Sequence, residues 1–346
     1  MPLQSTLPIA NAIAFAFLRA GRVACPQGAI YWPVMRTLAL LTLSAATLCA
    51  QPEIPYEFSN PLKLPADMNL GEAAGIALNS KGHIFVYNRG AHTSLFEFDP
   101  AGKFLREIGK DLYGFSFAHV VKIDKDDNIW CVDEGSNMVM EFNPEGHIIM
   151  TIGRKAEPSE APAAGREIPP ARDNAFNRPT DIAWDAAGNG YISDGYNNSR
   201  VAKVDVDGNW VKSWGKRGTE PGNFHTPHTI ATDEKGNVYV GDRENSRIQV
   251  FSSDGEYLRQ FMGVGAPWAI CITPGPNQVL YTSDSRPGRI YKLDLNGNIL
   301  GVFGKAGKKP GQFGWIHEMA CPNENTLYVS EILNWRVQKL VLHPTK

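Results

Sequence analysis

Short apolar segments separated by polar turns recur along this chain with a period of about 40 residues. A representative module has an apolar strand at 228–231, a Lys-Gly-Asn turn at 235–237 and a β-branched and aromatic strand at 238–240. A third strand follows at 247–251 and a fourth at 257–261. Because alternation with period two and frequent turn residues are typical of short antiparallel strands, each module predicts one four-stranded β-sheet.

Six modules of this kind can be aligned, and no convincing helical segment interrupts them. Their approximate bounds are 71–110, 115–154, 176–218, 224–263, 265–305 and 313–342. The sequence therefore predicts an all-β fold, a six-bladed β-propeller in which each module forms one blade. The sixth module ends after its third strand, so we expect residues 56–64 to supply its outer strand and to cover both open edges.

The first 50 residues do not follow this pattern. Residues 1–34 are interpreted as an extension from an upstream start-codon assignment. Residues 35–50 are interpreted as a signal peptide, with a basic start, an apolar core and cleavage before Gln51. The apolar core is too short for a membrane span. We therefore expect one exported domain at 51–346, periplasmic or extracellular, with a polar, proline-rich surface loop at 155–175.

Net charge and cysteine count limit the possible binding partners and cross-links, but they do not indicate a reaction. The formal net charge of −2 gives no electrostatic reason for binding nucleic acid, and we expect a monomer. Three cysteines follow the predicted signal peptide, Cys131, Cys271 and Cys321. Because an odd number scattered over three modules does not match a disulfide framework, we predict that they are buried strand residues.

Three histidines share one phase of the repeat, eight residues before the turn, in modules two, four and six. They are His119, His228 and His317, and the other modules carry Ala74, Thr180 and Trp268 at this position. Since alternate blades of a six-fold ring are related by threefold geometry, the three imidazoles should converge on the axis. Three histidine ligands with an open fourth position are typical of a catalytic zinc site. For any one of them, an ordinary polar residue at a strand start is the alternative.

Four motifs in the third and fourth modules carry a family resemblance. They are Phe-Asn-Arg-Pro-Thr-Asp at 176–181, Ser-Asp-Gly-Tyr-Asn-Asn-Ser-Arg at 193–200, Pro-Gly-Asn-Phe-His-Thr-Pro-His at 221–228 and Gly-Asp-Arg-Glu-Asn-Ser-Arg-Ile-Gln at 241–249. In these motifs the chain resembles the peptidyl-α-hydroxyglycine α-amidating lyase family, and the similarity runs through the whole propeller. The resemblance implies six NHL-type repeats and a reaction that splits a C-terminal α-hydroxyglycine into a peptide amide and glyoxylate.

The same resemblance implies roles for individual residues. His119, His228 and His317 would bind zinc, Tyr196 would be the catalytic base, Arg89 its partner at the active site, and Arg243 the contact for the substrate carboxylate. From the repeat itself, Arg89 and Arg243 each stand seven residues after the turn, in opposite modules, and Tyr196 stands one residue later in module three. We expect all three to face the same funnel as the metal. Alternatively, the arginines pair with acids of the repeat and Tyr196 packs at a strand end.

Three departures from the family pattern have consequences. Trp315 stands where the family has methionine, so we expect a different wall of the substrate pocket. The family's structural calcium implies Glu318 and the Val121 carbonyl as candidate ligands here, with glutamate in place of aspartate. The family's disulfide cysteines near the Asp-Gly-Tyr and Asp-Arg-Glu-Asn motifs are replaced by Asn197 and Val250.

The sequence therefore predicts an exported zinc-dependent lyase, with calcium as a structural candidate. Its substrates would be peptides or small molecules of the N-acyl α-hydroxyglycine type. One alternative is a metal-dependent hydrolase or lactonase on the same propeller, in which the metal activates water. Another is a non-catalytic scaffold of NHL repeats that presents its loops to a partner. Replacement of Tyr196 separates the first two, because only the lyase needs a tyrosinate.

Overall fold

The computed structural model describes residues 51–157 and 170–343. The predicted extension at 1–34 and the predicted signal peptide at 35–50 lie outside this part of the chain, as does most of the loop expected at 155–175. In the described residues almost all regular structure is β-strand, with one 3-10 helix, η1 (Arg243–Asn245). Nothing helical there has the length and hydropathy that crossing a membrane requires.

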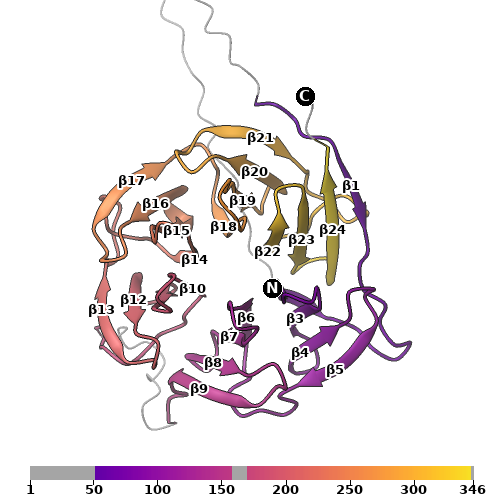
Figure 1. Cartoon of the computed structure of the whole chain (residues 1–346), viewed down its shortest axis with the longest axis horizontal. Coiled ribbons are helices and arrows are strands. Elements are labelled where there is room, and N and C mark those ends of the chain that lie inside the picture. Colours follow the sequence, from indigo (N-terminus) through magenta and orange to yellow (C-terminus); the bar gives the residue numbers. More distant parts are fainter. Residues whose placement is uncertain (1–50, 158–169, 344–346) are drawn as a thin grey trace, which may run out of the picture. The chain divides into compact units, whose positions relative to one another are not determined.

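Six antiparallel four-stranded sheets stand around a central axis, which confirms the predicted six-bladed β-propeller (Figure 1). We number these sheets blades one to six in chain order. In the first five blades the strands follow one another from the axis outward. The inner strands, which line the axis, are β2 (Glu72–Leu78), β6 (Ala118–Ile123), β10 (Asp181–Trp184), β14 (Pro227–Thr232), β18 (Pro267–Ile272) and β22 (Ile316–Asn323).

The remaining strands of each blade lie progressively further from the axis. The second strands are β3 (Ile84–Arg89), β7 (Ile129–Asp133), β11 (Gly190–Asp194), β15 (Val238–Asp242), β19 (Leu280–Asp284) and β23 (Thr326–Glu331). The third strands are β4 (Thr93–Phe98), β8 (Met138–Phe142), β12 (Arg200–Val204), β16 (Arg247–Phe251), β20 (Arg289–Leu293) and β24 (Arg336–Leu342). The outer strands are β5 (Phe104–Ile108), β9 (Ile148–Gly153), β13 (Trp210–Trp214), β17 (Tyr257–Phe261), β21 (Ile299–Phe303) and, in blade six, β1 (Tyr56–Ser59).

The N-terminal end of the described chain completes blade six. Strand β1 lies within the segment 56–64 and pairs antiparallel with β24. Isolated bridges on either side join Glu53 to Val302 in blade five and Lys63 to Lys103 in blade one. This segment therefore ties three blades together where the ring closes, and it covers the edge that β24 would otherwise expose.

The core consists of apolar clusters between neighbouring blades. Between blades one and two, Phe85 and Tyr87 pack with Val121, Cys131 and Met140, and each of these side chains is at most 2% exposed. Burial of such apolar faces is the main favourable contribution to folding. Because each cluster needs faces from two blades, no blade has a complete core of its own.

Two of the three cysteines form a disulfide, although an odd number of cysteines scattered over three modules does not match a disulfide framework. Cys271 on β18 and Cys321 on β22 are bonded, whereas Cys131 is a free, buried thiol. All three are buried, as predicted. The bonded pair lies 50 residues apart in sequence, but β18 and β22 are neighbours in the ring and the two Cα atoms are 6.1 Å apart. That separation permits a disulfide, and nothing local in the sequence indicates it.

Candidate functional site

The inner strands of blades two, four and six bring three histidines together on the axis. His119 lies on β6, His228 on β14 and His317 on β22, and each is at most 3% exposed. One nitrogen from each ring lies within 4.8 Å of those from the other two. The ring centroids are 4.6 to 5.1 Å apart. The structure thus assembles one cluster from the three histidines that share a phase of the repeat.

A local irregularity of each sheet aims its histidine at the axis. In all three blades the pairing register between inner and second strands shifts at the histidine. In blade two, Ala118 and Val120 pair with β7, while His119 between them does not. Such β-bulges take a side chain out of the normal alternation and are frequent beside functional sites.

A buried carboxylate at the end of each second strand fixes the loop that leads to the histidine. The carboxylate accepts a hydrogen bond of 2.7 to 2.9 Å from a backbone N–H two or three residues before the histidine. These acids are Asp133, Asp242 and Glu331, and each is 0% exposed. Because a buried carboxylate is stable only when it is well bonded, these contacts hold each loop in one position.

In two of the histidines the Nδ1 nitrogen already forms a hydrogen bond to a backbone carbonyl oxygen. His228 Nδ1 lies 2.7 Å from the Trp268 carbonyl oxygen, and His317 Nδ1 lies 2.8 Å from that of Ala74. These bonds place the proton on Nδ1 and leave Nε2 with a free lone pair, as in histidines that ligate metals. The Nδ1 of His119 is buried without a partner, so this ring too has unused bonding capacity.

Burial, and then the neighbouring histidines and arginines, lower the pKa of all three imidazoles and keep them neutral. Burial, followed by the other two histidines, holds the pKa of His119 well below its usual range. Burial and Arg243 do the same to the pKa of His228, and burial and Arg89 lower the pKa of His317 to about 3. Neutral imidazole is the form that binds metal, so this donor set fits a divalent ion such as zinc.

Beside the histidines lies a cavity of about 220 Å³, which we call the funnel. Arg89, Tyr196, Arg243 and Trp315 line it together with His317. The four residues that the sequence predicts for catalysis and substrate binding therefore share one cavity, although they come from four different blades. A cavity of this size accommodates a small ligand or the end of a larger one.

The Tyr196 hydroxyl lies between two of the histidines. It is 3.4 Å from His119 Nε2 and 3.2 Å from His228 Nε2. Burial, and then Glu134, raise the pKa of this phenol, whereas the neighbouring arginines lower it, Arg243 most. Tyr196 therefore faces the nitrogens that could ligate a metal, instead of packing away from the axis as a strand-end aromatic.

Arg89 both pairs with an acid and lines the funnel, so the two interpretations made from the sequence apply together. It donates to the Ala118 carbonyl at 2.7 Å and to the Glu72 carboxylate at 3.3 Å, as expected for an arginine that pairs with an acid. Its guanidinium also lies 3.7 Å above the Phe117 ring and lines the funnel. These contacts fix a positive charge at the cavity wall.

Arg243 stands on the other side of the funnel. Its Nε donates to Glu244 at 2.9 Å, and its guanidinium lies 4.5 Å from the Trp268 ring and 5.4 Å from the Tyr196 ring. Glu244 is a partly exposed acid, with 42% of its side chain accessible, so a substrate carboxylate can compete with it for the guanidinium. Arginine suits that role because it binds carboxylates through two parallel hydrogen bonds.

Sequence reasoning missed a third arginine and a buried acid in the funnel. Glu134 is 3% exposed, is hydrogen bonded to Arg178 and lies 3.9 Å from Arg89. The Arg178 guanidinium lies 4.9 Å from the Tyr196 ring. Glu134 therefore partly neutralises two of the three arginines that surround the phenol.

The alignment of the repeats could have indicated Arg178 as a residue of the funnel. Phe117, Arg178 and Trp315 each stand two residues before the position at which the histidines lie, and all three line the funnel. Arg178 and Trp315 have φ angles of 63° and 56°, in the left-handed region that bulky residues seldom adopt. Such strained positions cluster at functional sites.

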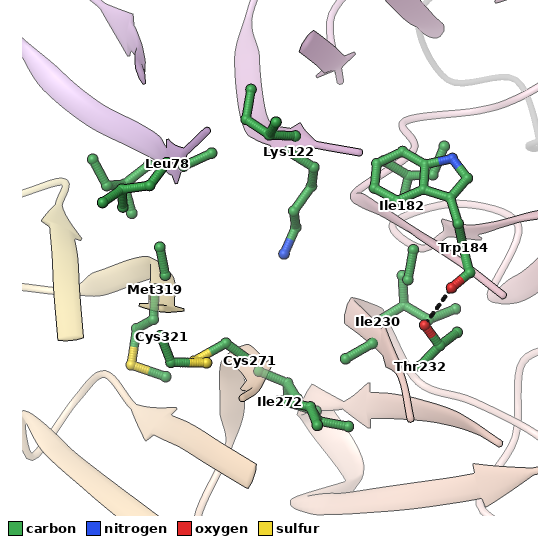
Figure 2. Close-up of a pocket in the computed structure, with 17 residues that line it drawn as sticks. Leu78, Lys122, Ile182, Trp184, Ile230, Thr232, Cys271, Ile272, Met319 and Cys321 are labelled. Carbon is green, nitrogen blue, oxygen red and sulfur yellow. Dashed lines mark hydrogen bonds between the residues drawn. A yellow bond between two sulfur atoms is a disulfide. The ribbon is translucent and has the colours of Figure 1, made fainter. Parts of the chain in front are cut away.

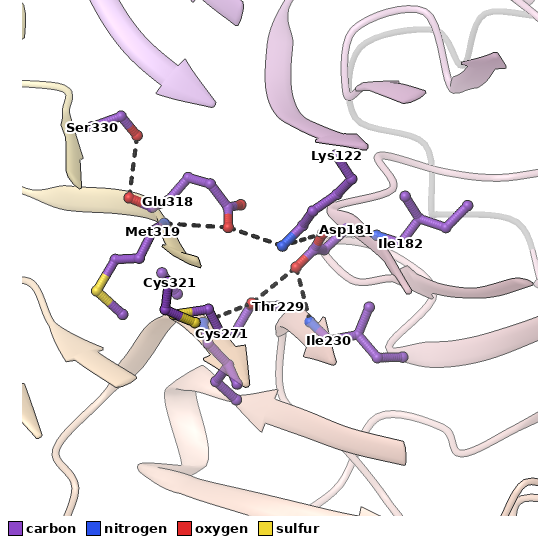
Figure 3. A network of polar contacts seen from close by, with 12 residues as sticks. Lys122, Asp181, Ile182, Thr229, Ile230, Cys271, Glu318, Met319, Cys321 and Ser330 are labelled. Carbon is purple, nitrogen blue, oxygen red and sulfur yellow. Dashed lines mark hydrogen bonds and ion pairs between the residues drawn. A yellow bond between two sulfur atoms is a disulfide. The ribbon is translucent and has the colours of Figure 1, made fainter. Parts of the chain in front are cut away.

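The candidate calcium ligands Glu318 and Val121 lie beyond the histidines on β22 and β6. Glu318 accepts a hydrogen bond of 2.9 Å from the Lys122 ammonium, which is also 3.5 Å from Asp181 (Figure 3). The place that a cation would take between these acids is thus held by an amine. With the ammonium in that place, the two acids are not available as calcium ligands, so the donor set as it stands does not fit calcium.

The fold and the site together define a six-bladed β-propeller with a three-histidine cluster on its axis, at the base of an arginine-lined cavity. Comparison with known proteins gives the relatives. The NHL repeat model matches residues 224–251. A probable peptidyl-α-hydroxyglycine α-amidating lyase of Caenorhabditis elegans is 29% identical over 79% of this chain and 83% of its own length. The chain is therefore a six-bladed propeller with an NHL repeat at 224–251 and sequence similarity to the amidating lyases, which confirms the resemblance seen in the motifs.

Longer relatives match this chain over only part of their own length, and a solved structure shares its fold alone. The peptidyl-glycine α-amidating monooxygenase B of Xenopus laevis is 28% identical over 77% of this chain, but the chain spans only 33% of that protein. NHL repeat-containing protein 3 of Mus musculus is 29% identical over 64% of this chain. A solved streptogramin B lyase matches 83% of this chain and 98% of its own, with a TM-score of 0.58 and 13% identity, which shows a shared fold alone.

Proposed function

We propose that this protein is a zinc-dependent lyase that cleaves N-acyl α-hydroxyglycine-type substrates to an amide and glyoxylate. The observation that carries the proposal is the position of Tyr196, whose hydroxyl lies 3.2 and 3.4 Å from the Nε2 nitrogens of two histidines. The relationship to the amidating lyases supports the same reaction. The signal-peptide pattern of residues 35–50, which lie outside the described structure, supports export.

In this proposal His119, His228 and His317 would hold the zinc. A zinc ion bound there would lower the pKa of the substrate hydroxyl. Arg243, with its single exposed acidic partner, would bind the substrate carboxylate, and Arg89 would add positive charge from the opposite wall.

The proton transfers fall to Tyr196. In its ionised form the phenol accepts the proton of the substrate hydroxyl, the carbon–nitrogen bond breaks, and the same proton passes to the amide nitrogen. The products are a primary amide and glyoxylate, no water is consumed, and Tyr196 returns to its ionised form. Burial, and then Glu134, raise the pKa of the phenol above its usual value, and Arg243 and Arg89 oppose this rise, which favours the ionised form.

The test measures glyoxylate release from an N-acylated α-hydroxyglycine, with the metal content of the same sample determined by elemental analysis. We expect about one zinc per chain, the number that a three-histidine catalytic site binds. Tyr196→Phe should lose activity by about 100-fold or more, the range for loss of a general base. Tyr113→Phe, at a tyrosine that is 70% exposed, is the matched control and should keep full activity.

Each other outcome favours one of the alternatives. Zinc without glyoxylate release, together with hydrolysis that survives Tyr196→Phe, would support a metal-dependent hydrolase or lactonase. A protein that binds no metal under any loading condition would support a non-catalytic NHL-repeat scaffold.

A further inference from the structure

A second polar cluster lies on the axis beyond the histidines, and the proposed function does not use it. Lys122 of blade two reaches Asp181 of blade three and Glu318 of blade six (Figure 3). The ammonium donates to Glu318 Oε1 at 2.9 Å and lies 3.5 Å from Asp181 Oδ1. The two acids are at most 1% exposed, and the lysine side chain is 17% exposed.

The repeat explains how this lysine reaches across the axis. Lys122 stands three residues after the histidine position. In the other five modules the equivalent residues are small, namely Ala77, Ala183, Ala231, Cys271 and Ala320. All of them line the same axial cavity as Lys122. One long side chain therefore enters a channel whose other walls are short, and its amine can meet acids from two other blades.

The acids are held by further donors. Asp181 Oδ2 accepts hydrogen bonds of 2.9 Å from the Thr229 hydroxyl and from the Ile230 backbone N–H, both in blade four. Glu318 Oε1 also accepts from the Met319 N–H at 3.2 Å, whereas its Oε2 is buried without a partner. The cluster thus links four blades, and one carboxylate oxygen has bonding capacity left.

A cavity on the axis adjoins this cluster. A cavity of about 270 Å³ lies on the axis at the end away from the histidines, and Lys122 projects into it between Met319 and Ile230 (Figure 2). The lysine side chain is 17% exposed, so solvent reaches it, whereas the two acids are at most 1% exposed. A divalent cation that approached these acids would meet the fixed positive charge of the amine, and like charges at hydrogen-bonding distance repel strongly in a buried site.

We propose that the Lys122 ammonium is the resident cation of the axis, which takes the place of a structural calcium beside Asp181 and Glu318 and fastens blades two, three and six without metal. An ammonium group suits this position because it is a compact charge with three donors. Loss of the amine should uncover a divalent-cation site formed by the two acids. This inference rests on the cluster alone and is independent of the proposed lyase activity.

The test compares thermal unfolding of the full, zinc-loaded protein in calcium-free buffer and in buffer with added calcium. The wild-type midpoint should be the same in both. Lys122→Ala should unfold at least about 5 °C lower without calcium, and added calcium, but not added magnesium, should restore much of this loss. Calorimetric titration should detect calcium binding to Lys122→Ala and none to the wild type. Lys125→Ala, at an exposed lysine in the following turn, is the matched control and should behave like the wild type.

Two results would overturn the proposal. One is a wild-type protein that is stabilised by calcium or retains it through purification. The other is a Lys122→Ala variant as stable as the wild type, or one that ignores calcium. If Lys122→Ala does not fold in either buffer, the Lys122→Arg variant is the deciding test. Because arginine keeps the positive charge, this variant should fold and its unfolding midpoint should not change with calcium. A Lys122→Arg protein that calcium stabilises would contradict the proposal.

Discussion

The two ends of the axial channel use the same inner strands for opposite purposes. At the funnel end three neutral imidazoles face one another and the nearest charged groups are arginines. At the other end two carboxylates enclose one amine. His119 and Lys122 stand three residues apart on β6, and His317 and Glu318 are adjacent on β22. A shift of a few residues along one strand thus separates a cluster of nitrogen donors from a cluster of oxygen acceptors that enclose an ammonium group.

The two ends differ in whether their donor atoms already have a positively charged partner. Both ends offer polar atoms from several blades, so convergence on the axis is not sufficient. Nitrogen donors without a resident positive charge fit zinc, whereas oxygen donors already paired with an ammonium do not fit calcium. The funnel end is therefore expected to depend on metal for function, and the other end to contribute stability without it.

Removal of one histidine should have the largest effect, and it acts only on the funnel end. His228→Ala leaves two ligands, so we expect loss of bound zinc and at least about a 100-fold fall in glyoxylate release, since even outer-shell changes cost 10- to 100-fold. Elemental analysis and the glyoxylate assay measure both. His225→Ala, three residues earlier in the same motif, is the control and should retain zinc. A His228→Ala protein with full metal content would show that the imidazoles do not form the metal site.

Removal of an acid at the other end should change stability and leave the chemistry intact. Asp181→Asn leaves the Lys122 ammonium with Glu318 alone, and breaking a buried ion pair costs about 3 kcal/mol or more. Urea unfolding measures the loss, and zinc content and turnover should equal those of the wild type. Asp126→Asn is the control, because this acid is 64% exposed and pairs with an exposed lysine. A large fall in turnover at unchanged stability would show that the two ends are coupled.

Much of this arrangement could be predicted from the phase of the repeat. The alignment of modules gives the six-bladed propeller, and it gives the common position of His119, His228 and His317. The repeat also places Tyr196 and the two arginines at the same funnel, whereas the roles expected of them come from the family resemblance. These predictions succeed because a propeller places equivalent residues of each module at equivalent distances from the axis.

What could not be predicted depends on contacts between different modules. The bond between Cys271 and Cys321 joins neighbouring blades at positions that differ by one residue in phase, so the repeat does not align the two cysteines. Lys122 was visible as the one long side chain at a position of small residues, but its partners Asp181 and Glu318 lie on two other blades. Their pairing requires the three-dimensional channel.

The smallest effect is expected at the rim of the funnel, where Trp315 stands. Its indole packs on Trp268 with ring centroids 5.2 Å apart and is 39% exposed, so it offers an apolar wall next to Arg243. For substrates with an apolar acyl group, Trp315→Ala should raise KM about 3- to 10-fold, equivalent to ~1 kcal/mol of aromatic contact, with kcat nearly unchanged. Steady-state kinetics with a short and a long acyl chain measure the change.

The control for this prediction is Trp335→Ala, because Trp335 is 60% exposed and does not line the funnel. Its KM should equal that of the wild type for both substrates. If Trp315→Ala lowers kcat instead and leaves KM unchanged, the indole does not contact the acyl group. It would then act through Trp268, whose carbonyl oxygen lies 2.7 Å from His228 Nδ1 and whose ring supports Arg243. The funnel end would in that case depend on packing around its ligands as strongly as the other end depends on its ion pair.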